Sequence, residues 1–374
     1  MALRVLLVFD QLDLPEAQVF RRIAGKQIQL DVLCNTDGLH HKLFEGCPIS
    51  VEPLRCAHRL DVTAIRTVRR KLKAERYDIV HVFTSRTLSV VLLALLGLPY
   101  TPKVVAYRGA LGNVSRFDLT SQLTFRNKRV DRIVCVSDAV KHYLRSTGIP
   151  ESKLIRIYKG HELGWYSGAP RAALQEFGVP DNAFVVACVA NMRPNKGVDV
   201  LLAAAEELRD EPKLHYLLIG DVRDKRLLEI AEKLSVRDRL HFTGWRADAA
   251  KLIGPCDVLA LPTRYSEGLP KAVIEAMAQG VPPVASRVGG VPELVTDGVD
   301  GLVVTPGDSK ALARGILKLY RDPSLRRRFG TAAKQKIETQ FHVLQTVQQT
   351  VELYCDLAGE EVSVSETIGL AGVR

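Results

Sequence analysis

The sequence lacks the features that accompany secretion or membrane insertion. No apolar run approaches the roughly 20 residues that a membrane-spanning helix needs. The longest run, at 88–98 (LSVVLLALLGL), is about half that length and predicts a buried helix. The start, MALRVLLVFD, ends in an acidic residue and has no small-residue cleavage site, so it predicts a first core strand rather than a signal peptide. We therefore expect a globular protein of the cytoplasm.

Cysteine pairs and metal-ligand patterns are also missing. None of the seven cysteines stands in a C-x-x-C pair, and most fall inside apolar runs, which is typical of buried thiols in a reducing compartment. Cys47, Cys56 and His58 come nearest to a zinc site, but their spacing matches no common ligand pattern. No D-x-D triplet occurs either, so we expect no metal held by paired aspartates.

Negative charge is scarce in the first half of the chain. Residues 1–165 hold 26 Lys and Arg against 15 Asp and Glu, a balance of +11, whereas the remainder holds 26 against 27. Such asymmetry indicates an anionic partner for the first half: a phospholipid surface, a phosphorylated or acidic acceptor, or nucleic acid. Nucleic acid is the weakest of these, because the basic half has no interleaved aromatics and no recognisable reader motif.

One basic segment, 61–78 (DVTAIRTVRRKLKAERYD), predicts an amphipathic helix. Its apolar stripe is formed by Val62, Ile65, Val68 and Leu72. Its other surface carries five cations, Arg66, Arg69, Arg70, Lys71 and Lys73. We expect the stripe to pack on a sheet and the cations to face an anionic membrane, where each contributes about 1 kcal/mol. A solvated helix face or an acidic soluble acceptor would explain the same charge.

Near-continuous apolar runs alternate with helical ones in two series. The first series comprises 3–9, 30–34, 78–83, 103–107 and 132–137, and the second 184–190, 214–220, 240–244, 257–262, 282–286 and 300–304. Apolar strands separated by helices predict parallel sheets covered on both faces. The expected fold class is therefore α/β, with two doubly wound Rossmann-like domains. Ligands bind at the carboxyl ends of such strands, which we expect to face a cleft between the domains.

A Gly- and Pro-rich segment separates the two series and predicts a linker near 164–172. The expected domains are 1–165 and 172–340. A helix at 341–358 follows, which is a candidate to return to the N-terminal domain, and then a loosely attached tail at 359–374.

The most informative stretch is EGLPKAVIEAMA, which begins at Glu267. Gly268 and Pro270 end a loop and start a helix, whose N-terminus presents N–H groups and a partial positive charge to a phosphate. Glu267 lies just before this helix and Glu275 about one turn into it, so both carboxylates are placed to accept hydrogen bonds from sugar hydroxyls beside that phosphate. The alternative is that Glu275 pairs with Lys271 on a solvated helix face.

Two further loops carry charge or flexible backbone. In ANMRPNKGVDV, Arg193 and Lys196 lie in a turn that opens a helix, where two cations can clamp a pyrophosphate without a metal. Solvated loop cations are the alternative. In SRVGGVPELV, Gly289 and Gly290 let the backbone approach a ligand, although a plain turn also uses two glycines.

These three elements, in this order, resemble glycosyltransferase family 4, the retaining group 1 family with the GT-B fold. The resemblance covers most of 184–340 and is most specific in EGLPKAVIEAMAQGVPPVAS. It implies that Glu267 contacts the donor sugar, Glu275 the nucleotide ribose, and Arg193 with Lys196 the diphosphate. The other positions that it implies around the donor are Gly268, Leu269, Pro270, Gly244, Trp245, Gly289 and Gly290.

The resemblance also implies an activity. The N-terminal domain would bind the acceptor and the C-terminal domain a nucleotide sugar, with UDP-sugars expected before GDP-sugars. The enzyme would transfer a hexose-type sugar, with retention of configuration, to a glycan or lipid-linked acceptor in polysaccharide or lipopolysaccharide synthesis. The donor is a substrate, and neither cofactor nor metal is expected because cations and a helix N-terminus balance the phosphate charge. Peripheral contact with the inner face of the cytoplasmic membrane fits such an acceptor.

The first half departs from the family pattern. Residues 9–20 lack its Gly-Gly loop, Arg108 stands where it often has histidine, and Asn191 takes the commoner arginine position of the basic pair. Arg108 is a candidate to stabilise the departing diphosphate, but it cannot act as a neutral acid or base at pH 7. His81 and His161 are more readily packed histidines than catalytic ones. A GT-B epimerase or phosphorylase, or a non-catalytic nucleotide-sugar-binding partner protein, stays open as an alternative.

Overall fold

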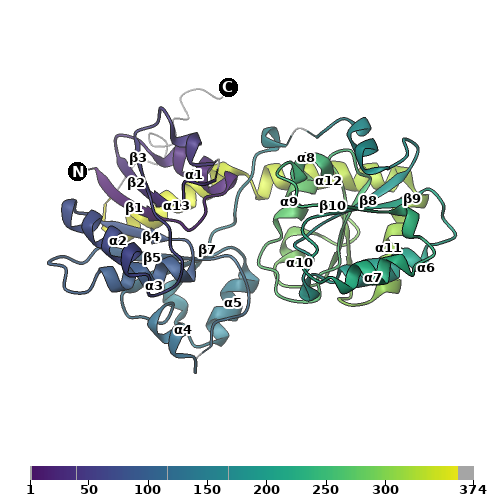
Figure 1. Cartoon of the computed structure of the whole chain (residues 1–374). Coiled ribbons are helices and arrows are strands. Elements are labelled where there is room, and N and C mark those ends of the chain that lie inside the picture. Colours follow the sequence, from purple (N-terminus) through teal and green to yellow (C-terminus); the bar gives the residue numbers. More distant parts are fainter. Residues whose placement is uncertain (1, 39, 116, 167, 361–374) are drawn as a thin grey trace. The chain divides into compact units, whose positions relative to one another are not determined.

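The structure is a computed structural model that describes residues 2–38, 40–115, 117–166 and 168–360 (Figure 1). The chain forms two compact units, which divide at Gly160 and again at Val343. The first unit contains the described residues up to Gly160 and those from Val343 onward, and the second contains the chain between them. Most of the expected tail, from 361 on, lies outside the described residues.

The first unit is built on a parallel sheet of seven strands in the order β3-β2-β1-β4-β5-β6-β7. The strands are β1 (Leu3–Val8), β2 (Ile28–Cys34), β3 (Ile49–Pro53), β4 (Ile79–Val82), β5 (Lys103–Arg108), β6 (Val130–Cys135) and β7 (Leu154–Arg156). The order of the strands reverses between β1 and β4. The expected parallel sheet is therefore present, with two further strands, β3 and β7, at its edges.

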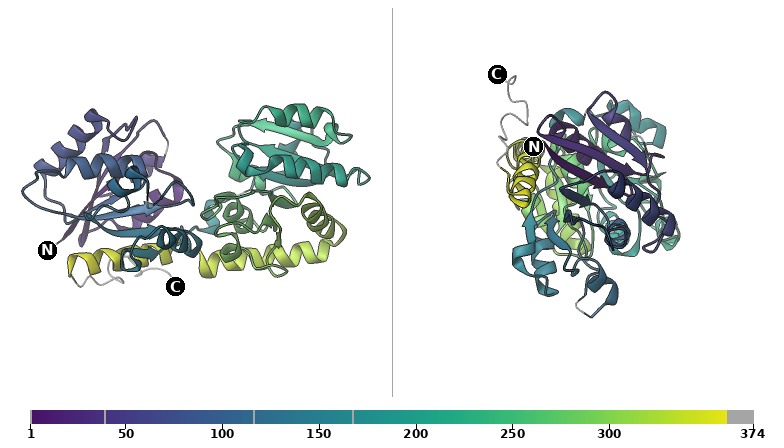
Figure 2. Two further views of the ribbon diagram at one scale, coloured as in Figure 1. Left: turned by 90° about the horizontal axis from the view of Figure 1, so that it is seen from below. Right: turned by 90° about the vertical axis from the view of Figure 1, so that its left-hand side faces the viewer.

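Six α-helices accompany this sheet in the described part of the first unit: α1 (Leu14–Ile23), α2 (Val62–Ala74), α3 (Ser85–Ala94), α4 (Leu119–Leu123), α5 (Asp138–Ser146) and α13 (Val343–Ala358). Short 3-10 helices lie at His40–Phe44 and Glu151–Lys153. Helix α13, yellow in Figure 2, follows the second unit in sequence but belongs to the first, where it packs against α1 and β4. Helix α2 packs against α3. Right-handed crossovers place α1 and α3 on opposite faces of the sheet, because the connections leave the centre in opposite directions.

The second unit repeats the design with six parallel strands in the order β10-β9-β8-β11-β12-β13. The strands are β8 (Phe184–Val189), β9 (Leu214–Ile219), β10 (Leu240–Gly244), β11 (Val258–Leu261), β12 (Pro283–Ser286) and β13 (Leu302–Val304). The α-helices are α6 (Val198–Glu207), α7 (Arg226–Glu232), α8 (Ala249–Ile253), α9 (Lys271–Ala278), α10 (Val291–Leu294), α11 (Ser309–Arg321) and α12 (Pro323–Gln340). Short 3-10 helices lie at Leu163–Trp165, Arg171–Phe177, Pro194–Lys196 and Arg237–Arg239. The order here reverses between β8 and β11.

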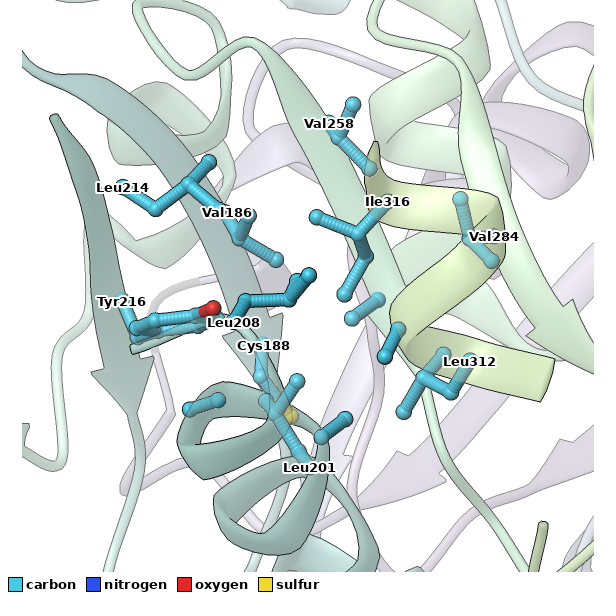
Figure 3. Close-up of a cluster of buried hydrophobic side chains, with 14 of the residues drawn as sticks. Val186, Cys188, Leu201, Leu208, Leu214, Tyr216, Val258, Val284, Leu312 and Ile316 are labelled. Atoms are coloured by element: carbon cyan, nitrogen blue, oxygen red, sulfur yellow. The ribbon is translucent and has the colours of Figure 1, made fainter. Parts of the chain in front are cut away.

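A continuous apolar core fixes these elements. Figure 3 shows side chains of β8, β9, β11 and β12 meeting those of α6 and α11. Val186, Leu201, Val258, Val284 and Ile316 are fully buried there. This core holds the carboxyl ends of β8 and β11 in place, and these ends carry the loops of the candidate site.

Helix α2 corrects part of the expected basic face. Lys71 is only 8% exposed, and its Nζ lies 2.8 Å from Glu52 Oε1 and 3.0 Å from Glu75 Oε1. Arg69 donates to the carbonyl of Leu96 at 2.5 Å. Val62, expected in the packed stripe, is 55% exposed. The prediction of five solvent-facing cations is therefore wrong for two of them; the exposed cations of α2 are Arg66, Arg70 and Lys73.

Candidate active site

The candidate site of the second unit lies where its strand order reverses. In a doubly wound sheet the loops after the two central strands diverge and leave room for a ligand at the carboxyl ends. The loop after β8 carries Arg193 and Lys196, and the loop after β11 carries Glu267. The two charged sequence motifs, in the loops after β8 and β11, therefore lie together at the position where a doubly wound sheet binds its ligand.

A glycine lets these two loops touch. Gly197 has a φ of +64° and precedes α6, and a Cβ there would lie 2.1 Å from the carbonyl oxygen of Pro262. Only glycine fits so close to another backbone in a left-handed conformation. The loops are joined again by the Arg264 N–H, which donates to the carbonyl of Asn195 at 2.9 Å, and by an ion pair of 2.6 Å between Arg264 and Asp199.

Glu267 and Lys196 form the charged centre of the site. Lys196 Nζ lies 2.5 Å from Glu267 Oε1, and Thr263 Oγ1 donates to the same oxygen at 2.9 Å. Glu267 is 7% exposed, and Thr263 is fully buried. A buried carboxylate held by two donors has a fixed orientation, which suits it to receive hydrogen bonds from a ligand.

The backbone beside Glu267 is strained. Ser266 has a φ of +75°, one of two described non-glycine residues with positive φ. For an L-residue this conformation costs roughly 1–2 kcal/mol and tends to persist where a functional geometry requires it. The strain lies immediately before the carboxylate that sequence analysis selects.

The second carboxylate, Glu275, lies inside α9. This helix follows Pro270, as expected, and no side chain caps it. Glu275 is 7% exposed, and Lys271 Nζ lies 3.5 Å from its Oε1. The i, i+4 pair exists, but it does not lie on a solvated face, because the carboxylate is buried.

The glycine pair of the third motif supports the Glu267 loop. Gly290 N–H donates to the carbonyl of Gly268 at 3.0 Å, so the loop after β12 is bonded to the loop after β11. Gly289 has a φ of +50°, which favours glycine. Leu269 is half-buried between these contacts and α9.

The remaining donor-site predictions lie at the margin or elsewhere. Trp245 is 67% exposed after β10, and Gly244, with a φ of +69°, accepts a hydrogen bond from Gly220 N–H at 2.8 Å. Arg193 is exposed. The structure thus joins Lys196 to Glu267, and the glycine loop to the Glu267 loop. Within the described part of the chain, Arg193 contacts the pair through its backbone alone, since its carbonyl accepts from Lys196 N–H at 2.9 Å.

Arg108 belongs to the first unit and is already bonded. Arg108 is 9% exposed. Its guanidinium donates to the carbonyls of Ala110, at 2.8 Å, and Gly112, and lies 3.4 Å from Ser85 Oγ. Burial lowers the pKa of Arg108. These bonds hold the loop after β5 in shape. The expected role of Arg108 toward a diphosphate stays a prediction.

Both histidines are packed in the structure, as expected. His81 Nδ1 lies 2.7 Å from Tyr354 Oη of α13, and its ring stacks on Phe83. Burial lowers the pKa of His81 to about 3. His161 is buried and hydrogen-bonded to Tyr166.

Sequence reasoning missed the residues that hold the site together. Thr263, Arg264 and Ser266 lie between the apolar end of β11 and Glu267, and Gly197 and Gly220 permit close approach of backbones. Only Thr263 gave a local signal, as a polar residue directly after an apolar run. The others depend on contacts between loops far apart in sequence.

The described residues contain neither a metal-ligand cluster nor a helix suited to spanning a membrane. Within 2–38, 40–115, 117–166 and 168–360, no group of three or more His, Cys, Asp or Glu could hold a metal ion. No helix in these ranges combines the length and apolarity needed to cross a membrane.

Comparison with known proteins gives the family. A family model described as glycosyl transferases group 1 matches residues 171–336, and one described as glycosyltransferase family 4 matches residues 17–164. The lipopolysaccharide core biosynthesis glycosyltransferase LpsE of Rhizobium meliloti is 30% identical over 239 residues, which cover 63% of this chain and 67% of that protein.

Two further relatives differ in the length they share with this chain. The UDP-Gal:alpha-D-GlcNAc-diphosphoundecaprenol alpha-1,3-galactosyltransferase of Escherichia coli is 24% identical over 91% of this chain and 92% of its own length. The N-acetyl-alpha-D-glucosaminyl L-malate synthase of Bacillus anthracis is 26% identical over 65% of this chain and 64% of its own length.

Solved structures agree with the fold. Anabaena HepE in complex with UDP-glucose superposes with a TM-score of 0.79 at 25% identity, over 94% of this chain and 99% of that one. A glycosyltransferase from Rickettsia africae gives 0.81 at 18% identity, over 96% and 100%. With two Rossmann-like units and matches to both family models, the chain belongs to glycosyltransferase family 4, the group 1 glycosyltransferases of GT-B fold.

Proposed function

We propose that this glycosyltransferase transfers a sugar from a UDP-sugar to a lipid-linked or other anionic glycan acceptor, with retention of configuration and without a metal. The observation that carries the proposal is the Lys196–Glu267 pair of 2.5 Å at the reversal point of the second sheet. A cation beside a fixed carboxylate suits a ligand that combines phosphate with sugar hydroxyls.

Each partner of the pair has a separate task in this proposal. Lys196 would neutralise charge that develops on the diphosphate as the sugar departs, and a fixed cation in a partly buried site does this without reorganisation. Glu267, oriented by Thr263, would accept a hydrogen bond from a sugar hydroxyl. Glu275 would hold the ribose, and exposed Arg193 would add charge at the solvent side.

The comparisons support the substrate classes. Crystal structures show HepE in complex with UDP and with UDP-glucose. The Escherichia coli relative is named for a UDP-Gal donor and a diphosphoundecaprenol acceptor. The basic first half of this chain suits an acceptor of that charge.

Peripheral contact with an anionic membrane is part of the proposal. Arg66, Arg70 and Lys73 of α2 are exposed, and none pairs with a carboxylate in the described part of the chain. Sedimentation with phosphatidylglycerol vesicles should fall at high salt and should not occur with phosphatidylcholine vesicles. Equal sedimentation with both, or with neither, would contradict this contact.

The function is tested by a donor screen. UDP, GDP and ADP, with their sugars, are compared by thermal unfolding, where a ligand at 100 times its Kd stabilises the protein by about 2.7 kcal/mol. The best donor is then incubated alone and with alkyl-diphosphate-linked N-acetylglucosamine, and the anomeric proton of the product is recorded by NMR. We expect UDP compounds to stabilise most and an α-linked product from an α-linked donor. Isomerisation of the donor alone would indicate an epimerase instead.

A further inference from the structure

We infer that the first unit holds an amphiphilic acceptor site, in which a polar pocket continues through Arg59 into a leucine-lined groove that takes the chain of a phosphorylated lipid. The inference rests on the proposed function and deepens it by naming the acceptor class and its contacts. Both parts of the site lie within the first unit.

The polar pocket lies at the reversal point of the first sheet. It has a volume of about 400 Å³ and is lined by Asp10, which follows β1, by Thr84, Ser85 and Arg86, which follow β4, and by His58 and Arg59. This is the position where a doubly wound sheet receives a ligand. Within it, Arg86 is paired with Asp10 at 2.6 Å and is bonded to the carbonyls of Cys56 and Ala57.

The groove is apolar and open. Its volume is about 380 Å³, and its apolar lining comes from Leu60, from Leu92, Leu93 and Leu96 at the end of the α3 segment, and from Leu119 and Leu123 of α4. Four of these leucines are more than half exposed, at 53–70%. A contiguous exposed apolar surface of this kind marks a binding site on a soluble domain.

The groove wall is held in place by two arginines. Arg69 donates to the carbonyls of Ala94 and Leu96, and Arg129 donates to the carbonyl of Leu95 at 3.4 Å. These bonds occupy the carbonyls at the C-terminal end of α3, so the leucines are presented from a fixed backbone rather than from a frayed helix end.

Arg59 joins the two cavities, because it lines both. No carboxylate of the described residues lies within 4.0 Å of it, whereas the charge of Arg86 is balanced by Asp10. Arg108 adds a second cation beside Ser85. Hydrogen bonds from Ser121 lower the pKa of the Asp118 carboxyl, and the nearby charge of Arg59 contributes to this lowering without a direct contact. A cation without a direct ion pair in the described residues therefore lies between a polar pocket and an apolar groove.

This arrangement specifies the occupant. A phosphate at Arg59 would leave its polar substituent in the pocket and its alkyl or prenyl chain against the leucines. A bilayer surface or a second copy of this chain would cover the leucines but would leave the pocket and Arg59 unused. Charge and shape together favour one amphiphile.

The test uses the full chain and simple probes. Calorimetric titration compares dodecyl phosphate, below its aggregation concentration, with butyl phosphate and with dodecyl maltoside. We expect dodecyl phosphate to bind at least tenfold more tightly than either. Arg59→Ala and Leu96→Asp should each weaken its binding at least tenfold. The matched controls are Arg21→Ala on α1 and Leu228→Asp on α7, both at exposed positions outside these cavities, and they should bind as wild type does.

A UDP titration of every sample separates this inference from the proposed function. Retained UDP binding in Arg59→Ala and Leu96→Asp shows that the second unit is folded in these variants, and an unchanged far-UV circular dichroism spectrum is required to show the same of the first unit. Equal binding of butyl and dodecyl phosphate, or unchanged binding in the two variants, would overturn the inference while leaving the proposed function intact. Leucine-dependent binding to phosphatidylglycerol vesicles without dodecyl phosphate binding would identify a bilayer surface instead. A concentration-dependent dimer lost in Leu96→Asp would identify a second copy.

Discussion

Replacement of Glu267 by glutamine separates the charge of the carboxylate from its shape. The side chain is 7% exposed and accepts from Lys196 at 2.5 Å and Thr263 at 2.9 Å. Glutamine keeps the volume and one acceptor oxygen, so the bonds from Thr263 and from the Lys196 ammonium group are both retained, and only the attraction between two opposite charges is lost. Because the Lys196 side chain is partly exposed, this ion-pair attraction contributes up to about 1 kcal/mol, and we expect a loss of that size in unfolding free energy.

The catalytic effect should exceed this structural one. If the hydrogen bond that Glu267 accepts from a hydroxyl of the donor sugar is stronger in the transition state than in the ground state, Glu267→Gln lowers turnover at least tenfold. This corresponds to about 1.4 kcal/mol of transition-state stabilisation. At 25 °C a loss of 1 kcal/mol from a stability of 5–15 kcal/mol leaves nearly all of the protein folded, so unfolding cannot explain a tenfold loss of rate.

The assay pairs initial rates, at saturating donor and acceptor, with urea unfolding of the same samples. Glu232→Gln, at an exposed position of α7 in the same unit, is the control and should leave both quantities unchanged. Wild-type rates in Glu267→Gln would refute the assignment, as would a rate that falls only in proportion to the folded fraction.

Three further predictions follow from the same contacts. Glu275→Gln should raise the Kd for UDP at least threefold by calorimetry if the carboxylate binds ribose; an unchanged Kd would contradict that role. Gly197→Ala should lose more stability in thermal unfolding than Gly298→Ala, because both have positive φ but only Gly197 has a backbone oxygen 2.1 Å from the added Cβ; equal losses would contradict the proposed loop contact. Burial lowers the pKa of His81 to about 3, so between pH 6.5 and 3 the unfolded chain binds a proton that the folded chain does not. The free energy of unfolding therefore decreases as the pH is lowered through this range, by up to about 1.4 kcal/mol per pH unit. His81→Phe should flatten this slope in urea titrations at pH 7 and 5, and an unchanged slope would argue against a neutral His81.

The sequence predicts the central strands of both sheets and both edge strands of the second sheet, but it misses the two edge strands of the first sheet. Central strands such as β1 and β8 are near-continuous apolar runs, because helices cover them on both faces. Strand β3, Ile49–Pro53, is partly exposed and ends in proline, and β7 has only three residues. Neither carries an apolar run that separates it from a loop, so both depend on pairing with a neighbour that is already formed.

The site divides in a similar way. Local signals select Glu267, Glu275 and Lys196, because helix starts and loop cations are encoded within a few residues. The 2.5 Å approach of Lys196 to Glu267 joins residues 71 positions apart and depends on the loop contact at Gly197, which no local pattern predicts. The prediction that Lys71 faces solvent is wrong for the same reason, because its partner Glu52 lies on a different element of the fold.

Calorimetric titration of UDP in EDTA tests the central claim most directly, namely that the loops after β8 and β11 bind a nucleotide diphosphate without a metal. Wild type is compared with Lys196→Ala and with Lys233→Ala, an exposed lysine just beyond α7. The account predicts metal-free binding to wild type and to Lys233→Ala, with at least tenfold weaker binding to Lys196→Ala. Equal affinity in all three, or binding of UDP only after Mg²⁺ or Mn²⁺ is added, would contradict it.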